Sequence, residues 1–100
     1  MLSTGIKGQA ETAVTEQNTA KAMGSGTLDV FATPAMVALM ESAAYRSVAA
    51  ELEPGMGTVG TLMNVEHVSA TPVGMRVTAE SELTEIDGRR LVFTVKAFDD

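Results

Sequence analysis

The sequence predicts an α+β domain in which an antiparallel β-sheet wraps around one long central α-helix. A mostly apolar stretch from Val30 to Leu52, with a proline near its start and Pro-Gly just after its end, is typical of a buried helix. Alternating apolar and polar residues at 75–86 and 90–98, joined by Asp87-Gly88, predict a β-hairpin. A long helix followed by a meander of strands indicates an α+β domain.

The central helix is expected to begin at Thr33, whose side-chain oxygen suits an N-cap, with Pro34 at the first helical position. Every residue from 35 to 40 is apolar, and a helix that is apolar nearly all round belongs in a domain interior or against a partner. Glu41 falls within this apolar stripe. Because burying a carboxylate is costly unless it is paired, hydrogen-bonded or neutralised, Glu41 is either a functional group or a residue at a wet groove edge.

The elements before the central helix are short. Residues 9–17 alternate weakly and predict an edge-like strand, and residues 18–23 are expected to form one helical turn. Gly24-Ser25-Gly26 is expected to be a flexible connector, because it lacks the Gly-Lys-Ser/Thr of a phosphate-binding loop.

A further strand is predicted after the helix, over Thr58 to Val68, with His67 on one of its faces. Gly60 interrupts its pattern and would let another backbone or a ligand come close. Residues 70–74 are expected to form a turn that leads into the hairpin.

Composition bounds the class of protein. One hundred residues make a single domain, 1–100, and a net charge of −6 argues against a nucleic-acid partner. With no cysteine and one histidine, the chain offers neither a disulfide framework nor a thiolate or His-rich metal site. The N-terminus lacks the apolar core of a signal peptide, and no apolar run reaches the ~20 residues that span a bilayer. We therefore expect a cytoplasmic protein with no membrane contact.

Motifs over residues 28–98 resemble the central-helix signature and downstream pattern of the fluoroacetyl-CoA thioesterase family, which has the hot-dog fold. The matching residues fall in similar order and spacing: Phe31-Ala32-Thr33, Met36-Val37, Leu39-Met40-Glu41, Gly57 to Gly60, His67, Ala70-Thr71-Pro72, Gly74 and Asp87 to Leu91.

The resemblance implies hydrolysis of an acyl-CoA thioester without a metal or organic cofactor. Carried over by position, the catalytic residues are Thr33, Glu41 and His67, and Gly60 matches a glycine near the scissile thioester. The acyl group would lie among apolar residues of the helix and the next strand, namely Ala35, Met36, Met40 and Met63.

The chemistry of these side chains is compatible with that reaction. Thioester cleavage needs a base or nucleophile, a proton donor and oxyanion donors. Glu41 could act as general base or as a nucleophile giving a mixed anhydride, and His67 suits proton shuttling. The backbone N–H groups of Ala35 and Met36, at the positive helix end, could hold the thioester oxygen. Without the resemblance, Thr33 is better explained as a plain cap, and His67 as a strand residue with a satisfied hydrogen bond.

Distance predicts a site shared between subunits. Thr33 and Glu41 are eight residues apart, about 12 Å along a helix, so their side chains cannot readily meet within one chain. Hot-dog proteins pair sheets edge to edge with helices back to back. We therefore expect a homodimer with two equivalent sites, which could assemble further into a tetramer.

Two departures from the family pattern alter these expectations. The segment matching the family's phenylalanine-bearing lid, residues 23–28, has no aromatic residue, which favours a more open site for some other acyl group. The sequence stops at Asp100, where relatives continue into a strand that would lie beside the one holding His67, so a C-terminal strand is expected to be missing. Candidate partners for the CoA phosphates are Arg76, Arg89, Arg90 and Lys96.

A second hypothesis is a non-catalytic acyl-CoA-binding or sensor module, a role that hot-dog domains also serve. A carboxylate kept in an apolar stripe argues against a mere binder. A hot-dog dehydratase is a third option, ranked lowest because it would usually need a different His–Asp or His–Glu arrangement.

Overall fold

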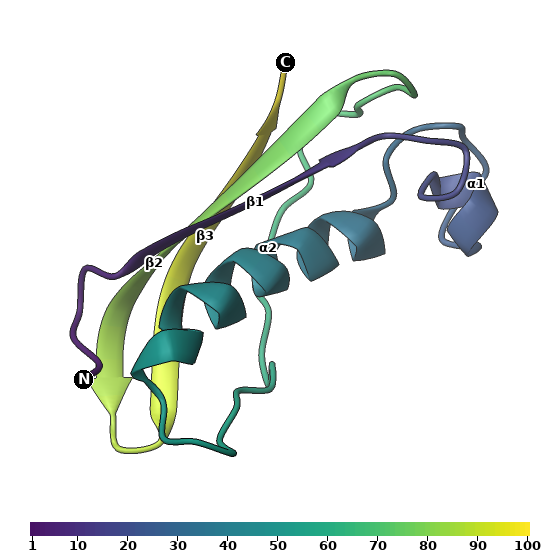
Figure 1. Ribbon diagram of the computed structural model, residues 1–100. Coiled ribbons are helices and arrows are strands. Elements are labelled where there is room, and N and C mark those ends of the chain that lie inside the picture. Colours follow the sequence, from purple (N-terminus) through teal and green to yellow (C-terminus); the bar gives the residue numbers. More distant parts are fainter.

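The computed structural model describes all residues, 1–100. Strands β1 (Lys7–Ala13), β2 (Arg76–Asp87) and β3 (Arg90–Asp99) form an antiparallel three-stranded sheet in the order β1-β2-β3. Helix α2 (Thr33–Val48) lies along one face of this sheet, as Figure 1 shows, and continues into a 3₁₀ turn, η1 (Ala49–Glu51). The architecture is the predicted sheet packed on one long helix.

The core lies between α2 and the sheet. Val77, Ala79 and Leu83 alternate along β2 and are buried, as the period of two predicted. Full burial of a side chain such as Leu83 contributes about 1.5–3 kcal/mol. The opposing face of α2 supplies buried residues at helical spacing, and β1 and the segment before α2 complete the cluster: Met36, Leu39, Met40, Ala43, Ala10, Val14 and Phe31.

The hairpin between β2 and β3 is confirmed. Asp87 pairs with Arg90 across the turn, and Gly88 adopts φ +60°, the left-handed conformation that glycine tolerates best. A register shift between Leu83 and Glu85 marks a bulge in β2.

The first elements differ in their bounds from the prediction. Strand β1 ends at Ala13 rather than at residue 17, because the Asn18 side chain accepts from Thr15 N–H and donates to Ala13 O, which turns the chain. Helix α1 (Ala20–Met23) follows, with Thr19 as its N-cap, so the predicted helical turn is confirmed.

Gly8 allows β1 to pack directly against α2. A Cβ at Gly8 would lie 2.6 Å from Ser47 Cβ and 2.8 Å from Ser81 Oγ and would collide with the Ala43 carbonyl oxygen. The Ala43 carbonyl and the Ser47 side chain of the helix therefore lie directly against the Gly8 backbone, with no room for a methyl group at this position.

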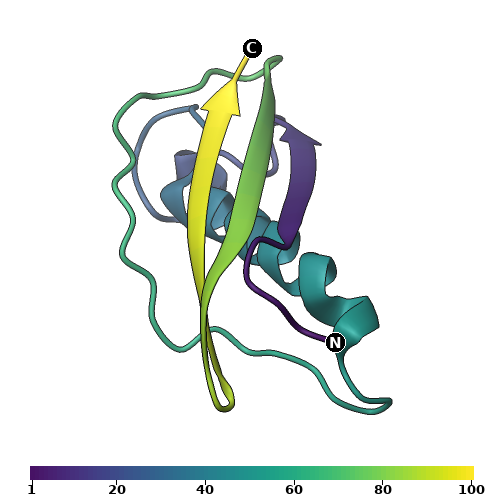
Figure 2. The same ribbon diagram turned by 90° about the vertical axis from the view of Figure 1, so that its left-hand side faces the viewer.

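The predicted strand at Thr58 to Val68 is wrong. Residues 57–70 form no helix or strand and make no backbone–backbone hydrogen bond. Figure 2 shows this segment as a coil along the β3 side of the molecule, opposite β1. Alternation in sequence predicts an extended backbone but cannot supply a neighbouring strand, and here no strand pairs with the segment.

The longest helix, α2, has 16 residues, and no helix of the structure has the length and apolar character needed to cross a bilayer.

Candidate functional site

Thr33 begins the helix and contacts His67. The N-cap is Ala32, which makes no side-chain capping bond, so the prediction that Thr33 is the N-cap is wrong by one position. Thr33 is already the first helical residue, so its side chain has no capping role. Thr33 Oγ1 and His67 Nδ1 are hydrogen-bonded at 2.7 Å, with the donor set by the histidine tautomer. When the hydroxyl donates to Nδ1, the ring carries its proton on Nε2.

The helix start offers one backbone donor fewer than predicted. Met36 N–H donates to the Ala32 carbonyl at 3.0 Å, as expected once Ala32 is the N-cap, so Met36 is not an oxyanion donor. Ala35 N–H has no acceptor among the hydrogen bonds of the chain. Ala35 thus remains the donor at the positive end of α2.

Glu41 lies on the exposed side of α2, together with Ala38 and Tyr45. The sequence left open whether Glu41 is buried or lies at a wet groove edge, and in the single chain it is exposed. Because α2 is apolar on nearly all sides, the pattern alone does not show which face the sheet covers, and the sheet covers the face of Met36 and Met40.

Glu41 contacts the backbone of Gly60. A Cβ built on Gly60 would collide with Glu41 Oε2 and would lie 3.3 Å from Glu41 Cδ. The close approach expected at this glycine is therefore an approach to the Glu41 carboxylate. Nothing else in the chain lies within 4 Å of that position, so the contact is specific to this side chain.

The residues identified from the sequence thus form two pairs. Thr33 with His67 and Glu41 with Gly60 lie at two places along α2, with residues 60–67 running back along the helix. Positions 33 and 41 are separated by about 12 Å along the axis of an α-helix. No hydrogen bond joins the two pairs within the chain.

A hollow of about 360 Å³ lies between α2, residues 64–69 and β3. His67 lines it together with Met36 and Met40, so the structure brings these three residues to one cavity. Its polar wall includes Thr71, whose hydroxyl donates to Asp99 at 2.7 Å. Sequence reasoning did not find that pair, because no local pattern links residues so far apart.

The other two residues expected to bind substrate lie elsewhere. Ala35 lines an open groove of about 430 Å³ with Met23 and Ala38. Met63 is 40% exposed and does not line either cavity. No three His, Cys, Asp or Glu side chains converge in a way that could hold a metal ion.

Comparison with known proteins gives a family match over most of the chain. The family model described as fluoroacetyl-CoA-specific thioesterase matches residues 14–100. A curated fluoroacetyl-CoA thioesterase of Streptantibioticus cattleyicolor is 51% identical over 71 residues, which cover 71% of this chain and 51% of the relative. The chain therefore spans about half the length of that relative.

Solved structures agree with the sequence match. A fluoroacetyl-CoA thioesterase structure superposes with a TM-score of 0.92 at 37% identity, covering 99% of this chain and 78% of the other. A mutant of that enzyme, described as in complex with fluoroacetate and CoA, gives 0.91 at 38% identity, covering 98% and 83%. A Thermus thermophilus protein described as a thioesterase superfamily member gives 0.89 at 28% identity, covering 99% and 73%. The chain has the hot-dog fold.

Proposed function

The chain belongs to the fluoroacetyl-CoA-specific thioesterase family, and we propose that it hydrolyses a small acyl-CoA thioester with Thr33, Glu41 and His67. The fluoroacetyl-CoA thioesterase of Streptantibioticus cattleyicolor and the CoA complex of the related enzyme support the substrate class. The arrangement of the three side chains supports the reaction.

The observation that carries the proposal is the separation of two complementary pairs along one helix. Thr33 and His67 provide a hydroxyl and an imidazole, and Glu41 beside Gly60 provides a carboxylate. Neither pair alone holds a base, a proton donor and an oxyanion donor together. A twofold axis crossing α2 between positions 33 and 41 would place each pair against the other pair of a second copy.

The exposed surface favours such a second copy. Only 15 of the 100 residues are buried, so one face of α2 and much of residues 57–70 are left uncovered. Val59, Leu62 and Val68 are each more than 80% exposed, and Tyr45 is 50% exposed. Exposed apolar surface next to Glu41 and His67 is typical of an interface. We infer a homodimer with two sites, each built from both subunits.

In this site Glu41 removes a proton from water, and the water oxygen attacks the thioester carbon. Ala35 N–H and the positive end of α2 stabilise the oxyanion that forms. When the oxyanion collapses, the C–S bond breaks, and His67 passes the proton that Glu41 removed from water to the departing thiolate, so the carboxylate and the neutral imidazole are restored. The products are the free acid and CoA. Thr33 orients the imidazole through its hydrogen bond to Nδ1.

Direct attack by Glu41 is the second route to the same products. It forms a mixed anhydride and CoA, and water then hydrolyses the anhydride. Repeated turnover in ¹⁸O-labelled water distinguishes the routes, because only the anhydride route can place the label in the Glu41 carboxylate.

The acyl group is expected to be small and not restricted to fluoroacetate. Residues 23–28 include no aromatic side chain that could close over the site, and these residues are exposed. Met36 and Met40 share the hollow with His67 and provide adaptable apolar surface for the acyl chain. The absence of an aromatic residue from 23–28 and the adaptable surface of Met36 and Met40 therefore both favour a pocket that accepts different small acyl groups.

The test measures hydrolysis of a panel of short and branched acyl-CoAs by monitoring the release of free thiol. Turnover that is lost on replacing Glu41 by Gln supports the proposal. Tight acyl-CoA binding with no turnover of any substrate would instead identify a binding or sensor module.

A further inference from the structure

We propose that Arg46, held over the ring of Tyr45, binds the phosphates of CoA. The inference rests on the proposed function and adds the residue that recognises the charged end of the substrate. CoA carries a diphosphate and a 3′-phosphate, whereas the chain has a net charge of −6, so its overall field repels this ligand. Binding therefore needs a local cation that no carboxylate already neutralises.

Three of the four basic residues expected to meet the phosphates are already paired. Arg76 contacts Glu11 at 2.8 Å, Lys96 contacts Glu80 at 3.4 Å, and Arg90 contacts Glu85 at 3.5 Å. These pairs occupy the sheet, on strands β2 and β3 and their neighbour β1. Such residues are poor candidates, because a phosphate would have to compete with the carboxylate.

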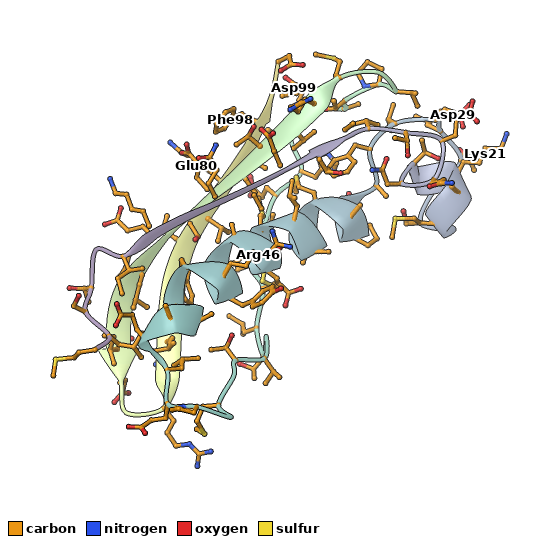
Figure 3. All side chains as sticks on the ribbon, viewed as in Figure 1. Lys21, Asp29, Arg46, Glu80, Phe98 and Asp99 are labelled. Atoms are coloured by element: carbon orange, nitrogen blue, oxygen red, sulfur yellow. The ribbon has the colours of Figure 1, made fainter.

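Among the remaining basic residues, only Arg46 lies on the helix that carries Thr33 and Glu41. Lys21 lies on α1 at one end of the molecule, well apart from Arg46, as Figure 3 shows. Lys7 stands opposite Glu82 in the β1–β2 register, and Arg89 lies in the turn between β2 and β3 rather than on the helix.

The surroundings of Arg46 leave its charge unmatched. No acidic residue lies within four positions on either side, so α2 offers no carboxylate at the spacing of a helical ion pair. No carboxylate of the chain lies within salt-bridge distance of its guanidinium. An exposed guanidinium in this state presents its N–H groups to an incoming anion.

Tyr45 contacts the guanidinium and is itself the helix-surface neighbour of Glu41. The Arg46 Cζ atom lies 5.9 Å from the centroid of the Tyr45 ring, within cation–π range. Tyr45 follows Glu41 by four residues and is its neighbour on the helix surface. The cation is thus one to two helical turns from the proposed base, about 7.5 Å along the axis. The pantetheine arm would bridge the reacting thioester and this charge, and the planar guanidinium suits bidentate phosphate binding.

The test compares Arg46→Gln with Lys21→Gln, which removes an exposed cation from α1, away from the helix that carries Thr33 and Glu41. Isothermal titration measures the binding of CoA, of dephospho-CoA and of phosphate-free pantetheine to each variant. We expect Arg46→Gln to raise the Kd for CoA about tenfold and to flatten its salt dependence, with pantetheine binding unchanged. Lys21→Gln is expected to bind all three ligands as the wild type does. If the loss persists with dephospho-CoA, the diphosphate is the group bound; if it disappears, the 3′-phosphate is.

Unchanged CoA affinity in Arg46→Gln overturns the inference, and so does an equal loss of pantetheine affinity, which would indicate a disturbed helix. The kinetics separate this failure from a failure of the proposed function. Acyl-CoA hydrolysis with the same KM in Arg46→Gln and wild type removes the role of Arg46 and leaves the thioesterase intact. A wild-type protein that neither binds CoA nor turns over acyl-CoA removes both.

Discussion

Replacing Gly60 by alanine places a methyl group where the Glu41 carboxylate lies. The added Cβ would be 3.3 Å from Glu41 Cδ and would overlap Oε2, so the carboxylate must move to restore a normal van der Waals separation. A displacement of about 1 Å at a reacting group can cost about 100-fold in rate. We therefore expect the kcat for acyl-CoA hydrolysis to fall by about that factor.

Stability is expected to respond in the opposite direction. Gly60 does not adopt a positive φ, so alanine fits its backbone, and the substitution reduces the entropy of the unfolded chain. The free energy of unfolding should be unchanged or raised by about 0.4–1 kcal/mol in urea titrations. Loss of activity without loss of stability is the signature of a displaced carboxylate.

Gly57→Ala is the matched control for this substitution. It lies in the same coil segment, has no positive φ, and a Cβ there meets nothing within 4 Å. Its activity and stability should match those of the wild type. Full activity in Gly60→Ala would refute the argument that the glycine exists to admit the Glu41 side chain.

Three further substitutions follow from the same contacts. Glu41→Gln removes the charge at nearly constant shape and should lower kcat at least ~100-fold, whereas an unchanged rate would exclude Glu41 from the chemistry. Thr33→Ala should reduce kcat. It should lower the free energy of unfolding by less than the ~1 kcal/mol of a lost N-cap, because Ala32 is the N-cap. A larger loss of stability in urea titrations would contradict this assignment. Gly8→Ala should lower the free energy of unfolding by about 1–3 kcal/mol, since its Cβ would press on Ser47 and Ser81; wild-type stability would show that α2 and β1 can separate at no cost.

Local sequence chemistry predicted the parts of the fold that depend on neighbours in the chain. The hairpin follows from Asp87-Gly88 and the alternation on either side of it, and the buried face of β2 follows from its period of two. Residues 58–68 show the limit of this reasoning. Their alternation is compatible with a strand, but a strand also needs a partner, and pairing is a property of the whole fold.

The candidate site residues came from the resemblance, and their local geometry was harder to predict. The resemblance selected Thr33, Glu41 and His67, and the structure shows that two of them are in contact although 34 residues separate them. The cap at Ala32 could not be anticipated, because the threonine that follows is the better capping residue by type. The sequence could not decide whether Glu41 is buried or exposed, since a helix apolar on nearly all sides does not specify which side the sheet covers.

Subunit complementation tests the shared site most directly. Glu41→Gln and His67→Asn each inactivate the protein, and mixing them under conditions of subunit exchange forms heterodimers. If each site takes Glu41 from one chain and His67 from the other, a heterodimer holds one intact site, and activity rises to about a quarter of the wild-type value at equal mixing. Activity that stays at the level of the separate variants, with heterodimers present by mass spectrometry, would contradict the account.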